Sequence, residues 1–223
     1  MRARLGTRAA LGVAFGALAG YHELRRVVIP DRLHFATNTT MAAVMAGVAA
    51  SSAMTADELG VTRAAVPKGV RCGAAAAGAI GAAVALAAAT GVDPTGTMGD
   101  RAALSGGEML FQVFVEIPIA TVLLEELAFR GVLGGLLGRL VSPRWAIACT
   151  SLAFGLWHVS PHSFTSLGRA GGALGTIAAT TFAGVCFHLL RRRSGSLVAP
   201  MLAHWGTNGM ALLAAWLVLR AKG

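Results

Sequence analysis

Long apolar stretches dominate this chain, and they constrain its fold more than any other feature. A transmembrane helix needs about 20 mostly apolar residues, and seven stretches approach that length, at residues 5–21, 33–56, 70–91, 108–129, 145–158, 173–190 and 196–219. Only 13% of the residues are charged, whereas soluble domains carry roughly a quarter. No strand-like alternation is visible. The sequence therefore predicts an all-α fold, a polytopic membrane helical bundle of about seven transmembrane helices.

Two segments widen the predicted count to between six and eight helices. Residues 5–21 have a basic start and a short apolar core, as a cleavable signal peptide does. We interpret them as an uncleaved helix, because the rest of the chain must insert into the membrane as well. Residues 131–140 form either a short separate helix or an extension of the preceding one. We predict a division into N-terminal helices with their connections, residues 1–104, and a core, residues 105–219.

The net charge of +9 comes from Lys and Arg that lie between the apolar stretches. This distribution is typical of loops at a membrane surface, where anionic lipids attract basic side chains. Membrane lipids are therefore the expected partners, and nucleic acid is not. On alternate sides of seven spans, more Lys and Arg fall on the side of the N terminus, which favours a cytoplasmic N terminus. Three widely spaced cysteines argue against a disulfide framework and are predicted to be small buried apolar side chains; they are Cys72, Cys149 and Cys186.

Three ionisable residues stand together in the apolar segment "LLEELAFRG", residues 123–131. Each charge inside a bilayer costs at least ~2.5–3.5 kcal/mol, so such groups face a partner or a wet cavity. Glu126 and Arg130 are four residues apart, which places them on one helix face as an ion pair. Glu125 points about 100° away and is a candidate general base. The alternative is that both acids only bind Arg130, or another basic group, and hold the bundle together.

Two further pairs at the same spacing lie on later apolar segments. Phe154 and His158 are one pair, and His204 and Asn208 are the other. With Glu125, these residues suit two kinds of chemistry. Glu125, His158 and His204 could bind a divalent metal ion such as zinc and leave one position open for water. Alternatively, Glu125 and His158 activate water directly, while His204 and Asn208 donate hydrogen bonds to an oxyanion. Both describe hydrolysis of an acyl bond, most simply a peptide bond.

Other hydrolase and nucleotide-binding signatures are missing. The chain has no HExxH, no GxSxG, and no GxGxxG followed by an acidic partner. We interpret His188, near the basic residues 191–193, as a structural core histidine.

The segments "EELAFR" (125–130), "FGLWH" (154–158) and "HWGTN" (204–208) match the motifs EExxxR, FxxxH and HxxxN in that order. In this respect the chain resembles the CAAX-protease and bacteriocin-processing (CPBP, or Abi) family of intramembrane proteases. The resemblance covers residues 111–213, and "TADELGVTR" (55–63) resembles a connection often found upstream of that core.

The resemblance implies transmembrane helices around a cavity within the bilayer, lined by four catalytic residues: Glu125, His158, His204 and Asn208. It implies supporting roles for Glu126, Arg130 and Phe154. The expected function is that of an intramembrane endopeptidase, with or without metal, acting on a membrane-associated peptide or protein. Two alternatives are a non-catalytic immunity or partner-binding protein and a proton-relaying transporter, but buried acids on a single helix disfavour the transporter. The Ala-, Gly- and Arg-rich composition suggests a bacterial plasma membrane, and we do not expect a CAAX substrate.

Overall fold

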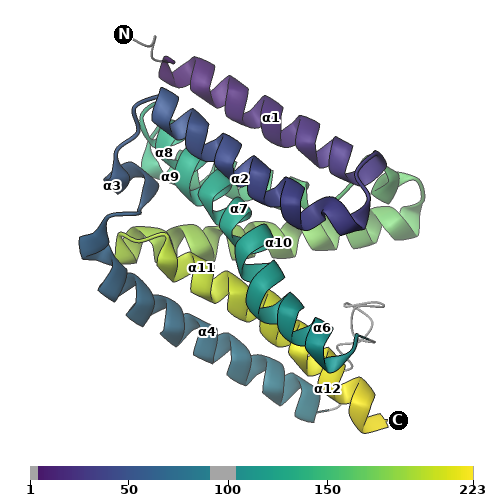
Figure 1. Cartoon of the computed structure of the whole chain (residues 1–223). Helices are drawn as coiled ribbons and strands as arrows, with labels where there is room; N and C mark the ends of the chain where they lie inside the picture. The colour runs from purple at the N-terminus through teal and green to yellow at the C-terminus, as the bar shows by residue number, and fades with distance from the viewer. Residues whose placement is uncertain (1–4, 91–103, 223) are drawn as a thin grey trace.

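The computed structural model describes residues 5–90 and 104–222, and every regular element in these residues is helical (Figure 1). The all-α prediction is therefore confirmed. The separate helices are α1 (Thr7–Val27), α2 (His34–Ser51), α3 (Ala56–Leu59), α4 (Val66–Ala89), α9 (Pro143–Trp157) and α10 (Leu167–Ser194). Short 3-10 turns lie at Asp31–Leu33, Arg63–Ala65 and Pro161–Phe164.

Two longer helical rods are built from consecutive α and π segments. The first contains α6 (Gly106–Phe111), η4 (Gln112–Val122), α7 (Leu123–Glu125), η5 (Glu126–Leu133) and α8 (Gly134–Gly138). The second contains α11 (Val198–Trp205), η7 (Gly206–Met210) and α12 (Ala211–Lys222). The segments η4, η5 and η7 have π-helical hydrogen bonding. Pro118 lies inside η4, where its missing N–H removes one helical hydrogen bond.

Among the described residues, four helical stretches are long and apolar enough to cross a membrane: Ala56–Ala89, Gly106–Gly138, Leu167–Ser194 and Val198–Ala221. The predicted count of about seven is therefore not confirmed. Polar residues interrupt the two N-terminal helices, α1 at Arg8 and at 22–26, and α2 at 37–40. The helix α9 has only 15 residues, which is short for a bilayer core of about 30 Å.

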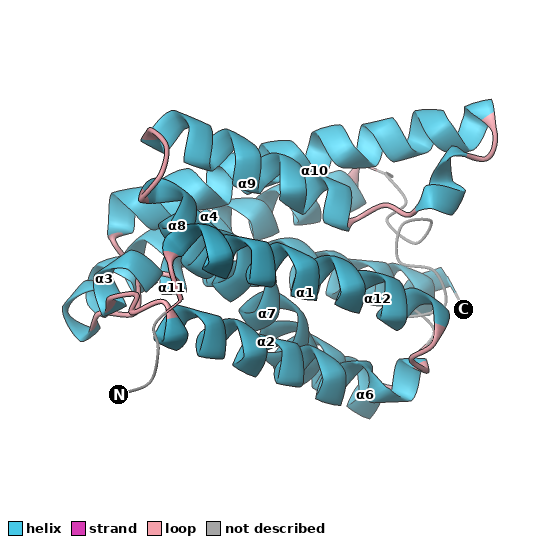
Figure 2. Ribbon diagram, turned by 90° about the horizontal axis from the view of Figure 1, so that it is seen from above, coloured by secondary structure: helices cyan, strands magenta, loops and turns pink. Residues whose placement is uncertain are grey.

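The first rod crosses the bundle between two helix pairs (Figure 1). Helices α1 and α2 pack together on one side of it, and α4 packs against α11 on the other. Helices α9 and α10 also pack closely together, as the view from above shows (Figure 2). Side chains from α1, α2, α7, η5 and α9 share one apolar cluster. This cluster holds the centre of the first rod in place.

Small residues allow the closest helix approaches, as in many membrane bundles. Gly69, Gly73 and Ala77 are buried on one face of α4. A Cβ built on Gly73 would lie 2.7 Å from the carbonyl oxygen of Ala199 on α11. On α9, Gly155 approaches α10 in the same way, because an added Cβ would lie 2.9 Å from the carbonyl oxygen of Ile177.

The cysteines do not occupy the core. Cys149 and Cys186 are exposed and Cys72 is half-buried. The prediction that all three are buried was wrong. In a membrane bundle an apolar residue can face outward at no cost, so apolar surroundings in sequence do not imply burial in the protein.

Candidate active site

The motif residues meet where π segments interrupt the two rods. Glu125 ends α7 and Glu126 begins η5, which also contains Arg130. His204 lies near the end of α11, and Asn208 lies in η7. Short π segments inside α-helices occur often at functional sites. Here they lie directly beside the polar residues, in the centre of otherwise apolar helices.

Glu126 and Arg130 form the predicted ion pair. Arg130 Nη1 donates to Glu126 Oε1 at 2.8 Å, and the two side chains are 2% and 0% exposed. The Arg130 guanidinium carbon also lies 4.0 Å from the ring centroid of Phe154 and 5.2 Å from that of Phe187. The cation is therefore enclosed by one carboxylate and two aromatic faces. Removing one partner of such a buried pair is expected to cost about 3–5 kcal/mol.

His204 joins the two acids. Its Nδ1 lies 2.8 Å from Glu126 Oε1, and its Nε2 lies 3.7 Å from Glu125 Oε2. The ring is 3% exposed and stacks on Phe187, with centroids 5.0 Å apart. Since a carboxylate oxygen only accepts hydrogen bonds, His204 Nδ1–H donates to Glu126. This contact orients Nε2 towards Glu125.

The Glu125 carboxylate accepts a hydrogen bond at one of its two oxygens only. Trp157 Nε1–H donates to its Oε1 at 3.1 Å. Its Oε2 is buried without a hydrogen-bond partner and lies 4.0 Å from His158 Nε2. The other nitrogen of His158, Nδ1, donates to the carbonyl oxygen of Phe154 at 2.7 Å, so a neutral His158 presents the lone pair of Nε2 to Glu125. A water about 2.8 Å from Glu125 Oε2 could also reach both imidazole Nε2 atoms.

A cavity of about 260 Å³ opens at this point. Glu125, His158 and Asn208 line it, together with other polar residues from α1, α2 and η4, namely Arg25, His34, Asn38, Gln112, Glu116 and Thr121. Ile117 supplies an apolar part of the wall. His204 lies behind Glu125, against the ion pair. Six of the seven candidate site residues therefore form one continuous set of contacts. The seventh, Asn208, shares the cavity with Glu125 and His158.

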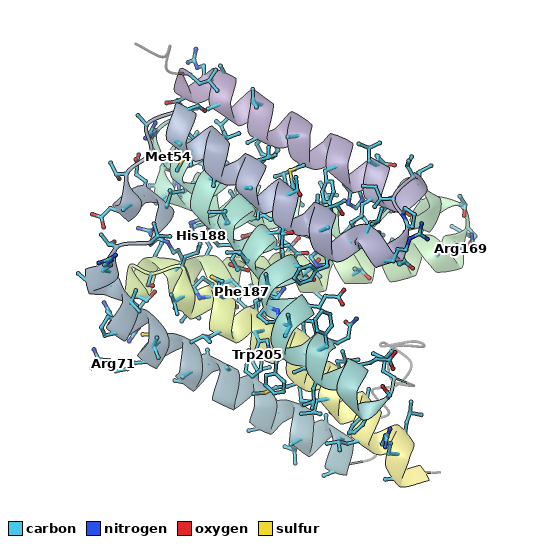
Figure 3. The ribbon with its side chains drawn as sticks, in the orientation of Figure 1. Met54, Arg71, Arg169, Phe187, His188 and Trp205 are labelled. Atoms are coloured by element: carbon cyan, nitrogen blue, oxygen red, sulfur yellow. The ribbon has the colours of Figure 1, made fainter. Side chains whose placement is uncertain are left out.

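Two contributors were not expected from the sequence. Trp157 lies between Phe154 and His158 in the second motif, but helical spacing does not show that its indole reaches Glu125. Phe187 lies on α10, near the middle of the bundle in Figure 3, and carries no polar group. Both depend on contacts between helices. The predicted structural role of His188 agrees with its burial and with the 3.3 Å separation between its Nδ1 and Thr150 Oγ1.

The predicted zinc ligands are Glu125, His158 and His204. One carboxylate and two imidazoles suit zinc chemically, and two ligand atoms of a tetrahedral zinc ion lie about 3.4 Å apart. The distances from Glu125 Oε2 to the two Nε2 atoms, 3.7 and 4.0 Å, are longer. In residues 5–90 and 104–222, no group of three or more His, Cys, Asp or Glu is arranged to hold a metal ion. The three side chains, at these separations, do not fit a three-ligand zinc site.

Comparison with known proteins gives one match. The family model described as Type II CAAX prenyl endopeptidase Rce1-like matches residues 107–210. No curated protein and no solved structure matches the chain. The matched segment contains both acids of the first motif, both histidines and Asn208. Over residues 107–210 the chain is therefore similar to the CAAX-protease and bacteriocin-processing family of membrane-embedded proteases.

Proposed function

We propose that this protein is an intramembrane endopeptidase in which Glu125 activates a water molecule for attack on a peptide bond. The observation that carries the proposal is the buried Glu125 Oε2. It has no hydrogen-bond partner and faces the Nε2 atoms of His158 and His204. A carboxylate in this state needs a partner, and a water molecule supplies one at the wall of a polar cavity. The family match over residues 107–210 supports the same class of reaction.

The reaction follows from the positions of the groups. Glu125 accepts a proton from the water as the water oxygen bonds to the carbonyl carbon of the substrate. The carbonyl oxygen becomes an oxyanion, to which the Asn208 amide can donate a hydrogen bond. Protonated Glu125 then gives this proton to the peptide nitrogen as the C–N bond breaks, either directly or by way of His158 Nε2. The products are a new carboxyl group and a new amine. His158 Nε2, 4.0 Å from Glu125, is placed to hold the same water.

The remaining motif residues position this group. Glu126 fixes His204 through Nδ1, Arg130 balances the charge of Glu126, and Phe154 covers Arg130 and accepts from His158 through its carbonyl oxygen. A non-catalytic immunity or partner-binding protein would not require a half-bound carboxylate beside two imidazoles. A proton relay would require titratable groups that continue across the membrane.

The substrate class follows from the location of the cavity. Its walls come from α1, α2 and η4, which expose large apolar side chains such as Phe15, Val44 and Phe114, so we propose a membrane-associated peptide or protein as the substrate. We further propose that the protein resides in a bacterial plasma membrane with its N terminus in the cytoplasm. Binding of a divalent zinc ion at Glu125, His158 and His204 is a separate proposal, and it would require these ligand atoms to move closer together than they lie here.

Cleavage of a membrane-tethered peptide library by purified protein tests the proposal. Wild type is compared with Glu125→Ala and His204→Ala, and Glu23→Ala serves as the matched control. Glu23 is a carboxylate on α1 whose side chain is 51% exposed. We expect cleavage by wild type and Glu23→Ala only. Equal turnover by all four proteins would contradict the proposal.

A further inference from the structure

Arg130 also lines a second polar cavity, and Glu125 is not part of its lining. It has a volume of about 200 Å³ and is lined by three arginines, Arg130, Arg191 and Arg192, with His188 beside them. The only carboxylate in its lining is that of Glu58. That carboxylate is held by Arg139, with Nε to Oε1 at 2.5 Å and Nη2 to Oε2 at 2.8 Å. The cavity therefore combines excess positive charge with a neutralised acid.

Two guanidinium groups in this lining have unused donors. Arg130 is only 3% exposed, and its Nη2 has no hydrogen-bond partner. Arg191 donates through Nη2 to the carbonyl oxygens of Asp57 and Glu58, at 2.7 and 3.3 Å, but its Nε is buried without a partner. A buried charged donor without a partner is costly, and such groups usually mark a water or an ion. Both donors are cationic, so an anion satisfies them best.

The backbone around the cavity favours the same ligand. Pro143 and Ala146, from the first turn of α9, line one wall. In this 15-residue helix Pro143 has no N–H, and the N–H groups of Trp145 and Ala146 donate to the carbonyl oxygen of Ser142. The helix therefore favours an anion here through the positive end of its dipole and not through free N–H groups of the lining residues. Gly134, Gly135 and Gly138 of α8 form another part of the wall. The side chains of His188 and Met54 approach Gly134 and Gly135, whereas the space beside Gly138 is open.

We propose that this cavity binds a phosphate-type oxyanion, either as free phosphate or as the headgroup of an anionic lipid. Its donors would be Arg130 Nη2, Arg191 Nε and the guanidinium of Arg192. Helices α3 and α8 lie at the end of the bundle nearest the N terminus (Figure 1). At this end Arg139 and Arg191 bind Glu58 and Asp57 of α3. Basic pockets at a membrane surface are typical sites for lipid phosphate groups. The proposal does not rest on the proteolytic activity, because it uses Arg130 Nη2, whereas Arg130 Nη1 donates to Glu126.

Binding is measured as stabilisation of purified protein in a neutral detergent. Thermal unfolding is followed against inorganic phosphate, with chloride at matched ionic strength, and in a second arm in nanodiscs with phosphatidylglycerol or phosphatidylcholine. Arg192→Gln removes a donor on an exposed side chain, and Arg193→Gln is the control, since Arg193 is also exposed but does not line the cavity. We expect Arg192→Gln to raise the apparent Kd about tenfold and Arg193→Gln to leave it unchanged.

A second pair of variants tests the site without removing an arginine. Gly138 lines the cavity, and a Cβ built there meets no atom within 4 Å. Gly138→Glu should abolish the stabilisation by placing a negative charge at the cavity, whereas Gly138→Gln should weaken it less. A shift with phosphate identifies the free anion as a sufficient ligand, and a shift confined to phosphatidylglycerol identifies the headgroup. Equal shifts in Arg192→Gln and Arg193→Gln, or no shift in either arm, would overturn the proposal.

Discussion

Replacing Glu126 by glutamine should destabilise the fold, while the same replacement at the neighbouring Glu125 should leave stability unchanged or raise it. The two acids are adjacent in sequence and both are buried. They differ in their partners, since Glu126 Oε1 lies 2.8 Å from both Arg130 Nη1 and His204 Nδ1. Glu125 has a neutral donor, Trp157, on one oxygen and no hydrogen bond on the other. The same chemical change therefore has opposite consequences at the two positions.

The magnitude follows from the state of Arg130. The variant Glu126→Gln keeps the side-chain shape but leaves a buried guanidinium without its counter-charge, which costs about 3 kcal/mol, at the lower end of the range for breaking a buried ion pair. For a chain of this length, that corresponds to a fall in Tm of roughly 6–12 °C. The variant Glu125→Gln removes a buried negative charge that is only half hydrogen-bonded, so no such fall is expected. Activity should be lost in Glu125→Gln even though the fold is retained.

Thermal unfolding of the two variants in the same detergent provides the assay. Adding Arg130→Met to Glu126→Gln serves as the control, because removing both charges should cost less than the sum of the single changes. A Glu126→Gln protein with the Tm of wild type and no activity would refute the reasoning. It would show that Glu126, rather than Glu125, takes part in the chemistry.

Three further predictions test other parts of the structure. Gly73→Ala should destabilise the protein by about 1–3 kcal/mol, because its Cβ would meet the backbone of Ala199. Gly78→Ala is the control and should not destabilise it, because a Cβ there meets nothing within 4 Å. Equal free energies of unfolding for the two variants, measured in denaturant, would contradict this prediction. Trp157→Phe should lower kcat about tenfold by releasing Glu125 Oε1, with little change in Tm, and an unchanged kcat would remove Trp157 from the site. Protein treated with a chelator, and shown by elemental analysis to lack divalent metal, should keep its activity; loss of activity that zinc restores would favour the metal-dependent alternative.

Contacts within one helix were the part of the site that sequence could predict. The spacing of Glu126 and Arg130 was sufficient to predict an ion pair, and the structure confirms it. Helical spacing also predicted that Glu125 points away from this ion pair, and the two acids do have different partners. Such predictions succeed because residues four apart share a helix face whatever the tertiary fold is.

Contacts between helices could not be derived in this way. His204 and Glu126 are 78 residues apart, and nothing in either local sequence shows that Nδ1 reaches this particular carboxylate. The apolar Phe187, which stacks on His204, has no local signal at all. The motifs could indicate that these helices meet, but the pairing of atoms depends on how the rods cross.

The predicted number of spans was less successful for a physical reason. A moderately apolar stretch such as α1 or α2 can be stabilised by packing on other helices instead of by lipid, and both contribute to the shared apolar cluster. Hydropathy reports the average environment of a segment. It does not show whether that environment is lipid or protein.

The origin of the oxygen in the cleaved product tests the central claim most directly. A single-turnover cleavage of the membrane-tethered peptide in water enriched in oxygen-18 is analysed by mass spectrometry, with Glu125→Gln beside wild type. Direct attack by water activated by Glu125 predicts one oxygen-18 atom in the new C-terminal carboxyl group of the wild-type product and no product from the folded variant. Cleavage by Glu125→Gln at the wild-type rate, or a first-turnover product without the label, would contradict the account.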